Sequence, residues 1–206
     1  LPICNYGRLD RYSPESREYE EVPEETITAE ASGEFHREWA WYPKAVSPNE
    51  QYLIMCADPE GEDLQYDYYF MLFDRKENRA VWEQGLYTGE FDEPGPSSVS
   101  NTGAAAVVQD DNLFMINPDG TLRFSLLWSD TGRRWQRMDM SADGSLILGR
   151  ATTGDTVWLY SSDGTRLWEK SSVCHEKGGY LAVSPNGEFV AYADRKGPHI
   201  VTPEGS

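Results

Sequence analysis

The sequence contains few cysteines, which limits the ways in which the chain can be held together. Cys4, Cys56 and Cys174 are odd in number and widely spaced, so they do not form the framework of disulfides that stabilises small secreted domains. We therefore expect a reduced, cytoplasmic setting, with one disulfide as the alternative.

Basic residues are also scarce, since 18 Lys and Arg face 35 Asp and Glu and the net charge is −17. Binding to DNA or RNA requires a basic surface, so we expect no nucleic-acid partner, and an anionic membrane surface is excluded for the same reason. The chain also lacks the roughly 20 consecutive apolar residues of a membrane span, so we expect no membrane insertion.

Lysine is the scarcer of the two basic residues, with 5 Lys against 13 Arg. An acidic, lysine-poor composition is typical of proteins from halophilic microbes. In molar salt the Debye length is about 3 Å, which screens the repulsion between acidic groups. We therefore predict a halophilic source; an ordinary acidic protein is the alternative.

What the chain has instead is a repeat of two kinds of turn. The first kind follows a serine and leads into a strongly apolar segment. Its four copies have serines at intervals of 53, 41 and 43 residues, in the segments 45–57 (Ser47), 98–109 (Ser100), 139–151 (Ser141) and 182–194 (Ser184).

The second kind is a hairpin such as "VWLYSSDGTRLWEK" (157–170), in which apolar and polar residues alternate on both sides of Asp-Gly. Its relatives lie at 70–83, 114–126 and 199–206, with a fainter copy at 8–22. These copies align on one position, occupied by Tyr12, Phe73, Ile116, Tyr160 and Val201.

Together the two turns define a unit of four strands and about 42 residues. A single four-stranded sheet cannot bury both of its faces, whereas sheets packed radially around an axis do so. We predict an all-β fold, a β-propeller of four-stranded antiparallel blades. A β-sandwich is the alternative, but it does not account for a four-strand repeat with two distinct turns.

The segments "LYSSDGTRLWEK" (159–170) and "MLFDRKENRAVWE" (71–83) resemble the hairpin of quinoprotein-like (PQQ-type) repeats, and "SPNGEFVAYA" (184–193) resembles the inner hairpin of WD40-like repeats. The resemblance implies a β-propeller. The cofactor-site residues of quinoprotein dehydrogenases have no match here, so it implies fold and not dehydrogenase activity, and we expect no cofactor.

We expect one propeller domain over 1–206, with four to five blades in this chain. Its predicted parts are partial blade strands (1–22), an acidic connection (23–36), three blades (37–96, 97–130 and 131–172) and a partial blade (173–206). The N-terminal piece supplies up to two strands. Either it shares a blade with the C-terminal piece and closes a four-bladed ring, or the chain is part of a larger propeller.

Candidate metal and catalytic residues are few. Cys174 and His175 are adjacent, but neighbours in a strand point to opposite faces, so we predict no metal site there; the alternative, if both lie in a loop, is a zinc site with Cys4 or His36. The acidic loop 56–70 does not match the calcium-binding EF-hand pattern. No nucleophile motif accompanies His36, His175 or His199, so we predict no catalytic residue.

Tryptophans fit packing better than ligand binding. Trp39 and Trp41 could stack on a sugar ring, but their spacing also suits packing between blades, which we favour. Trp82 and Trp168 recur at matching positions of the repeat, so we predict that both pack between blades.

Two groups of residues are candidates for contact with another protein. Tyr66, Tyr68 and Tyr69 follow the acidic loop, and tyrosine is a common interface residue because it combines apolar area with a polar tip. The second group, Arg133, Arg134, Trp135 and Arg137, is the densest basic stretch of an acidic chain. Its alternative role is local charge balance.

We therefore predict a non-catalytic propeller scaffold that binds another protein or a subunit of a larger assembly. The alternative is a propeller enzyme or carbohydrate-binding protein with a site at the central axis. A binding module should carry its aromatic and charged contact residues on one rim, whereas an enzyme should bring His, Asp or Glu side chains together at the axis.

Overall fold

The computed structural model describes the backbone of eleven segments, and their side chains from residue 41 onward except at Asp194. The segments are 2–5, 8–13, 18–21, 41–57, 68–86, 94–109, 111–127, 135–151, 156–171, 181–194 and 197–206. Within them, all regular secondary structure is β-strand.

Three of the sheets are four-stranded antiparallel meanders, in which each strand pairs with the next along the chain. The first contains β4 (Trp41–Val46), β5 (Tyr52–Ala57), β6 (Tyr68–Asp74) and β7 (Arg79–Leu86). The second contains β8 (Ser97–Val99), β9 (Ala105–Gln109), β10 (Asn112–Ile116) and β11 (Leu122–Leu126). The third contains β12 (Trp135–Met140), β13 (Leu146–Ala151), β14 (Val157–Ser161) and β15 (Arg166–Lys170).

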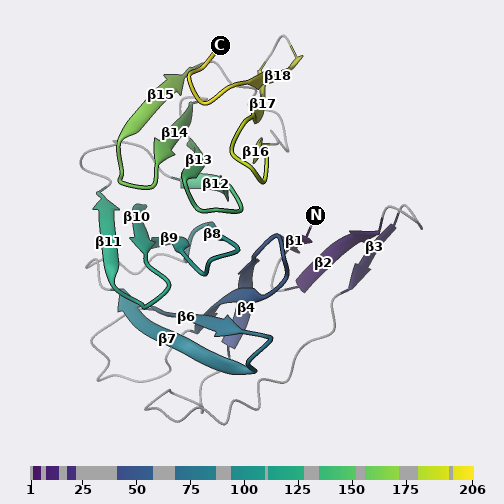
Figure 1. The fold of residues 1–206 in the computed structure, drawn as a ribbon, viewed down its shortest axis with the longest axis vertical. Helices are drawn as coiled ribbons and strands as arrows, with labels where there is room; N and C mark the ends of the chain where they lie inside the picture. Colours follow the sequence, from purple (N-terminus) through teal and green to yellow (C-terminus); the bar gives the residue numbers. More distant parts are fainter. Residues whose placement is uncertain are drawn as a thin grey trace.

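Two further sheets have three strands each. The N-terminal sheet contains β1 (Pro2–Asn5), β2 (Arg8–Ser13) and β3 (Glu18–Glu21), and the C-terminal sheet contains β16 (Leu181–Val183), β17 (Val190–Asp194) and β18 (Gly197–Val201). The five sheets follow one another in an arc around a common centre, and β4, β8, β12 and β16 lie on the inner side of that arc (Figure 1). The predicted all-β propeller of four-stranded antiparallel blades is confirmed.

The N-terminal sheet differs from the sequence prediction, because it has three strands and not two. Strand β1 lies beside β4 as β5 lies beside β8 and as β13 lies beside β16. It therefore takes the place of the second strand of a blade. The N- and C-terminal strands belong to separate sheets, so they do not share a blade in the way that a four-bladed ring requires.

The serine turns explain why the first hairpin of each blade forms where it does. Each serine hydroxyl accepts a hydrogen bond from the backbone N–H that opens the following strand. The four bonds run from Tyr52 to Ser47 (2.9 Å), Ala104 to Ser100 (3.0 Å), Leu146 to Ser141 (3.0 Å) and Phe189 to Ser184 (2.8 Å). A side chain that closes its own turn fixes the register of the hairpin locally.

The second repeated position, which we call the bulge position, lies on the third strand of each complete blade opposite a β-bulge in the fourth strand, where Val81, Arg123 or Leu167 is the extra residue. The pairing register shifts between Leu72 and Phe73, between Met115 and Ile116, and between Leu159 and Tyr160. The alignment of Phe73, Ile116 and Tyr160 made from the sequence is therefore confirmed in structural terms.

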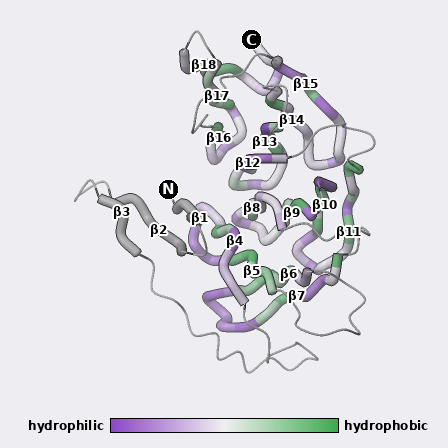
Figure 2. The backbone as a smooth tube through the Cα atoms, turned by 180° about the vertical axis from the view of Figure 1, so that it is seen from behind, coloured by the Kyte–Doolittle hydropathy of each residue, from purple (hydrophilic) through white to green (hydrophobic). Residues whose placement is uncertain are grey.

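The core lies between the blades. Apolar residues gather in middle strands such as β5 and β9 (Figure 2), and three buried clusters join residues of neighbouring sheets. Where the next blade turns from its third to its fourth strand, a glycine faces an aromatic side chain on the preceding blade. The pairs are Gly120 with Trp82, Gly164 with Phe124, and Gly205 with Trp168. The predicted packing of Trp82 and Trp168 between blades is confirmed.

Candidate protein-interaction surface

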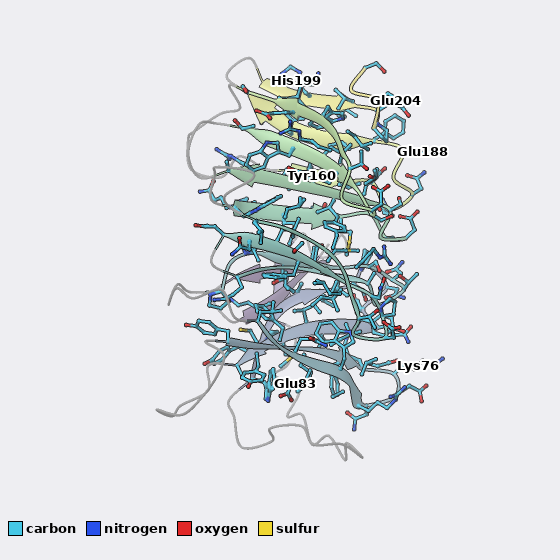
Figure 3. All side chains as sticks on the ribbon, turned by 90° about the vertical axis from the view of Figure 1, so that its left-hand side faces the viewer. Lys76, Glu83, Tyr160, Glu188, His199 and Glu204 are labelled. Carbon is cyan, nitrogen blue, oxygen red and sulfur yellow. The ribbon has the colours of Figure 1, made fainter. Side chains whose placement is uncertain are left out.

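The meander topology gives the module two different ends. The turns between first and second strands and between third and fourth strands lie at one end, which we call the turn end. The loops between second and third strands and the links between blades lie at the other, the loop end. Lys76, Glu188 and Glu204 mark the turn end on the right of Figure 3.

The turn end is held together by hydrogen bonds that cross from blade to blade. The backbone N–H of Asn49 donates to Oδ1 of Asn101 (2.8 Å), the N–H of Asn101 donates to the carbonyl of Ala142 (2.7 Å), and the N–H of Ala142 donates to the carbonyl of Pro185 (3.0 Å). These bonds link four consecutive sheets, so the turn end forms a connected frame that resists relative movement of the blades.

Acidic side chains of the turn end are occupied by their own turns. The hydroxyl of Ser161 and the N–H of Thr165 donate to Asp163, and these bonds hold the pKa of Asp163 below its usual value. The hydroxyl and N–H of Thr121 lower the pKa of Asp119 in the same way. These carboxylates therefore have a structural role.

The loop end carries the described members of both predicted contact groups. Tyr68 and Tyr69 begin β6, where both are half-buried, and Arg137 is exposed on β12. Strands β6 and β12 run in the same direction within their sheets, so their first residues lie at the same end. Tyr42, near the start of β4, adds a side chain that is 41% exposed.

The other predicted contact residues are placed differently or lie outside the described residues. Tyr66, Arg133 and Arg134 lie outside the described residues. Trp135 is only 4% exposed, and its ring packs against Trp158 at a centroid distance of 5.2 Å and against Tyr160 at 6.1 Å. A buried ring has little area for a partner, so we assign Trp135 to packing between blades and remove it from the contact residues.

Two arginines lie opposite each other at the loop end. Arg137 on β12 pairs in register with Arg150 on β13, so both side chains project from the same face of the sheet. Arg137 is exposed and Arg150 is buried. The exposed Arg137 places a positive charge on the surface of a chain of net charge −17, which suits an acidic ligand group.

Sequence reasoning missed the carboxylate that links β12 to the C-terminal sheet. Asp139 accepts hydrogen bonds from the N–H groups of Val183 (2.7 Å) and Met140 (2.9 Å). Burial raises the pKa of Asp139 to about 6. A signal was present in the repeat, because the residue two positions before the turn serine is Ala45, Ser98 or Ala182 in the other blades.

The remaining candidate residues are the cysteines, the histidines, the acidic loop and two tryptophans. No group of three His, Cys, Asp or Glu side chains suited to a metal ion occurs in the described part of the chain. Cys56 is buried, and the ring of His199 stacks on Tyr192. Cys4, His36, Cys174, His175, Trp39 and the acidic loop residues 58–67 fall outside the described side chains.

Trp41 packs against the buried cluster of Leu53, Met55, Met71, Phe73 and Ala80. All of these residues belong to the same blade as Trp41, so the contact is packing within a blade, and the packing of Trp41 between blades stays a prediction. Among the residues that the structure covers, no helix has the length and apolar character to cross a membrane.

Comparison with known proteins gives a structural match only. No family model and no curated protein matches the sequence. A similar solved structure is the β-propeller domain of Cps50 (Swd1) from Myceliophteria thermophila, with a TM-score of 0.50 and 10% sequence identity over 78% of this chain. The fold is a β-propeller. The chain spans about half of that domain, since the match covers 53% of it. At this identity the likeness shows the propeller fold, and the WD40-like or PQQ-like type of repeat stays a prediction.

Proposed function

We propose that this chain is a non-catalytic β-propeller module that binds another protein, or a subunit of a larger assembly, through its loop end. The observation that carries the proposal is the placement of Tyr68 and Tyr69 in the first complete blade, and of Arg137 in the third, at the same end of the module. This is the arrangement that the sequence reasoning required of a binding module. Tyrosine and arginine are also the residue types that contribute most to protein interfaces.

The opposite end of the blades supports this assignment. The cross-blade hydrogen bonds from Asn49 to Pro185 hold the sheets in fixed relative positions. Contact residues at the ends of fixed strands, such as Tyr68 and Arg137, lose little conformational entropy when they bind, and loop sequences can vary without disturbing the sheets. The exposed guanidinium group of Arg137 favours a partner with an acidic segment.

Further parts of the proposal concern the whole chain. We propose that residues 1–206 act as a single propeller domain with the blade limits given above. The scarcity of cysteine supports a cytoplasmic location, and the acidic, lysine-poor composition supports a halophilic source. A protein from such a source should need molar salt to reach full stability.

The experiment is a quantitative affinity purification from the source cell lysate in high salt, with mass spectrometry of the retained proteins. The wild-type chain is compared with Arg137→Glu at the loop end and with Lys76→Glu at the turn end. We expect Arg137→Glu to reduce recovery of the specific partner by about tenfold or more, because it places a like charge against an acidic segment. Lys76→Glu makes the same charge change on an exposed turn and should leave recovery unchanged.

Equal recovery with both variants would contradict a loop-end contact at Arg137. If the wild-type chain retains no protein and a small molecule stabilises it in a thermal-shift screen, the alternative of an axial enzyme or carbohydrate site takes its place. Asp139 would then be the first residue to substitute, because it is the acidic side chain of the described inner strands.

A further inference from the structure

The C-terminal sheet exposes apolar side chains at positions that the other blades bury. The residue before the bulge position is Leu72, Met115 or Leu159 in the complete blades, and each of these is 0% exposed. The equivalent residue of the C-terminal sheet is Ile200, which is 73% exposed. The pairing registers support this equivalence. Leu159 pairs with Leu148, and Ile200 pairs with Ala191. Leu148 and Ala191 lie the same number of residues after the turn serine of their own sheet.

A second position shows the same difference. The residue whose N–H donates to the turn serine is half-buried at Tyr52, 2% exposed at Ala104 and 8% exposed at Leu146, but 49% exposed at Phe189. Phe189, Ala191 and Ile200 occur at positions of the repeat that share one face of the sheet. We call this surface the open face.

The complete blades show what covers the equivalent positions. Leu146, Leu148 and Leu159 pack in one cluster with Val183, Val190 and Tyr192, which belong to the next sheet. In the same way Leu72 shares a cluster with Val107, and Met115 shares one with Ile147. The cover is in each case the adjoining face of the next blade, composed of β-branched, aliphatic and aromatic side chains.

We propose that the open face of Phe189, Ala191 and Ile200 is a docking surface for one more four-stranded blade of the same kind. Three blade-to-blade junctions occur within this chain, and a blade on the open face would form a fourth. Like the faces at those junctions, the open face consists of apolar side chains. At low ionic strength a second copy of this chain is a poor occupant, since each copy carries a net charge of −17 and the repulsion is not screened. The open face is separate from the loop end, so this proposal does not depend on the proposed function.

The chain offers its own surrogate for the partner blade. The turn after β18 is formed as in complete blades, because the N–H of Thr202 donates to the carbonyl of Ser206 (3.0 Å) as that of Asn117 does to Thr121 (2.8 Å). A copy of residues 122–170 fused directly after Ser206 therefore starts in the register of the repeat. It supplies a fourth strand and a following blade to the intact chain.

Three measurements test the proposal. The free full-length chain should be a monomer by light scattering, with Phe189 reactive toward hydroxyl radicals. The fused chain should show a Tm about 5 °C higher or more, and labelling of Phe189 should fall severalfold. Ile200→Asp in the fused chain should remove most of this gain, whereas Leu122→Asp in the original copy should preserve it. Leu122 is 56% exposed at the start of the outer strand β11 and does not belong to a blade junction.

Each contrary outcome overturns the proposal. A dimer that Ile200→Asp dissociates would assign the open face to a second copy. Protection of Phe189 in the free monomer would show that another part of this chain covers it. A fused segment that proteases remove back to residue 206, or a Tm gain that Ile200→Asp does not affect, would show that the face does not accept a blade.

Discussion

The complete blade β12–β15 and the C-terminal sheet β16–β18 have the same turns but different burial. Ser141 and Ser184 close their turns with hydrogen bonds of 3.0 and 2.8 Å, and the turns that begin at Ser161 and Thr202 close with bonds of 2.9 and 3.0 Å. Yet Leu159 is fully buried, whereas Ile200 is 73% exposed.

The comparison separates two sources of structure. Turn chemistry is local, so it appears in every copy of the repeat whether or not a neighbour is present. Burial comes from the adjoining blade, so the same position of the repeat contributes different amounts to the stability of the fold in different sheets. Paired substitutions in the two sheets therefore measure how much of the stability comes from contacts between blades.

The largest expected effect comes from overfilling a blade junction. A Cβ atom on Gly149 would lie 2.0 Å from Cζ3 of Trp135, whose ring is held against Trp158. Gly149→Val should therefore lower the free energy of unfolding by about 4 kcal/mol or more, measured by urea denaturation. Ala191→Val on the open face adds comparable volume and should change it by less than about 0.5 kcal/mol. Similar losses for the two variants would contradict the comparison.

The next effect comes from deleting side-chain volume at one position of the repeat. Leu159→Ala should cost about 3 kcal/mol, because it leaves a cavity among side chains of two blades. Ile200→Ala should cost less than about 0.5 kcal/mol, because water already contacts most of the side chain. The same urea experiment checks both. A costly Ile200→Ala would mean that the open face is covered in solution.

Asp139, at the junction of these two sheets, should make stability depend on pH. Burial raises its pKa from 3.8 to about 6 in the folded state. The folded protein thus binds the proton more tightly than the unfolded chain, and this contribution is fully present below pH 3.8 and is lost as pH rises through 6. The difference in unfolding free energy between wild type and Asp139→Asn should shift by about 2 kcal/mol across that range. A difference that stays constant from pH 4 to 7 would show that Asp139 has an ordinary pKa.

The smallest expected effect comes from removing the serine hydroxyl group that closes a turn. Ser141→Ala should cost about 1–2 kcal/mol, because it leaves the buried N–H of Leu146 without its acceptor. Ser184→Ala should cost about 0.5–1 kcal/mol, since the N–H of Phe189 lies at an exposed position that water reaches. Thermal unfolding followed by circular dichroism measures both. Equal costs would imply that Ser184 is as well shielded as Ser141.

Local signals made the repeat predictable from the sequence. Serine turns and hairpins are short patterns, so the serines and the bulge positions Phe73, Ile116 and Tyr160 align on residue types and spacing alone. Strand β1 was missed because "PICN" has four residues and no clear alternation. Its assignment as a second strand depends on its position beside β4, which is a tertiary contact.

The candidate contact surface was only partly predictable. Trp135 lies among arginines in the sequence and was grouped with them, but the neighbouring strand offers Gly149 beneath its ring. Whether Trp135 faces a partner or the core therefore depends on a cross-strand neighbour that local composition does not reveal. The open face was invisible for a related reason, because Ile200 matches Leu159 in pattern and differs only in what lies next to it.

The most direct test of the blade-to-blade account is an experimental structure of this chain that resolves its side chains. The account predicts sheets arranged about one centre, with Trp82, Phe124 and Trp168 each lying against the glycine of the next closing turn, at Gly120, Gly164 and Gly205. Two sheets stacked face to face, or these three aromatic residues at unrelated places in their sheets, would contradict it.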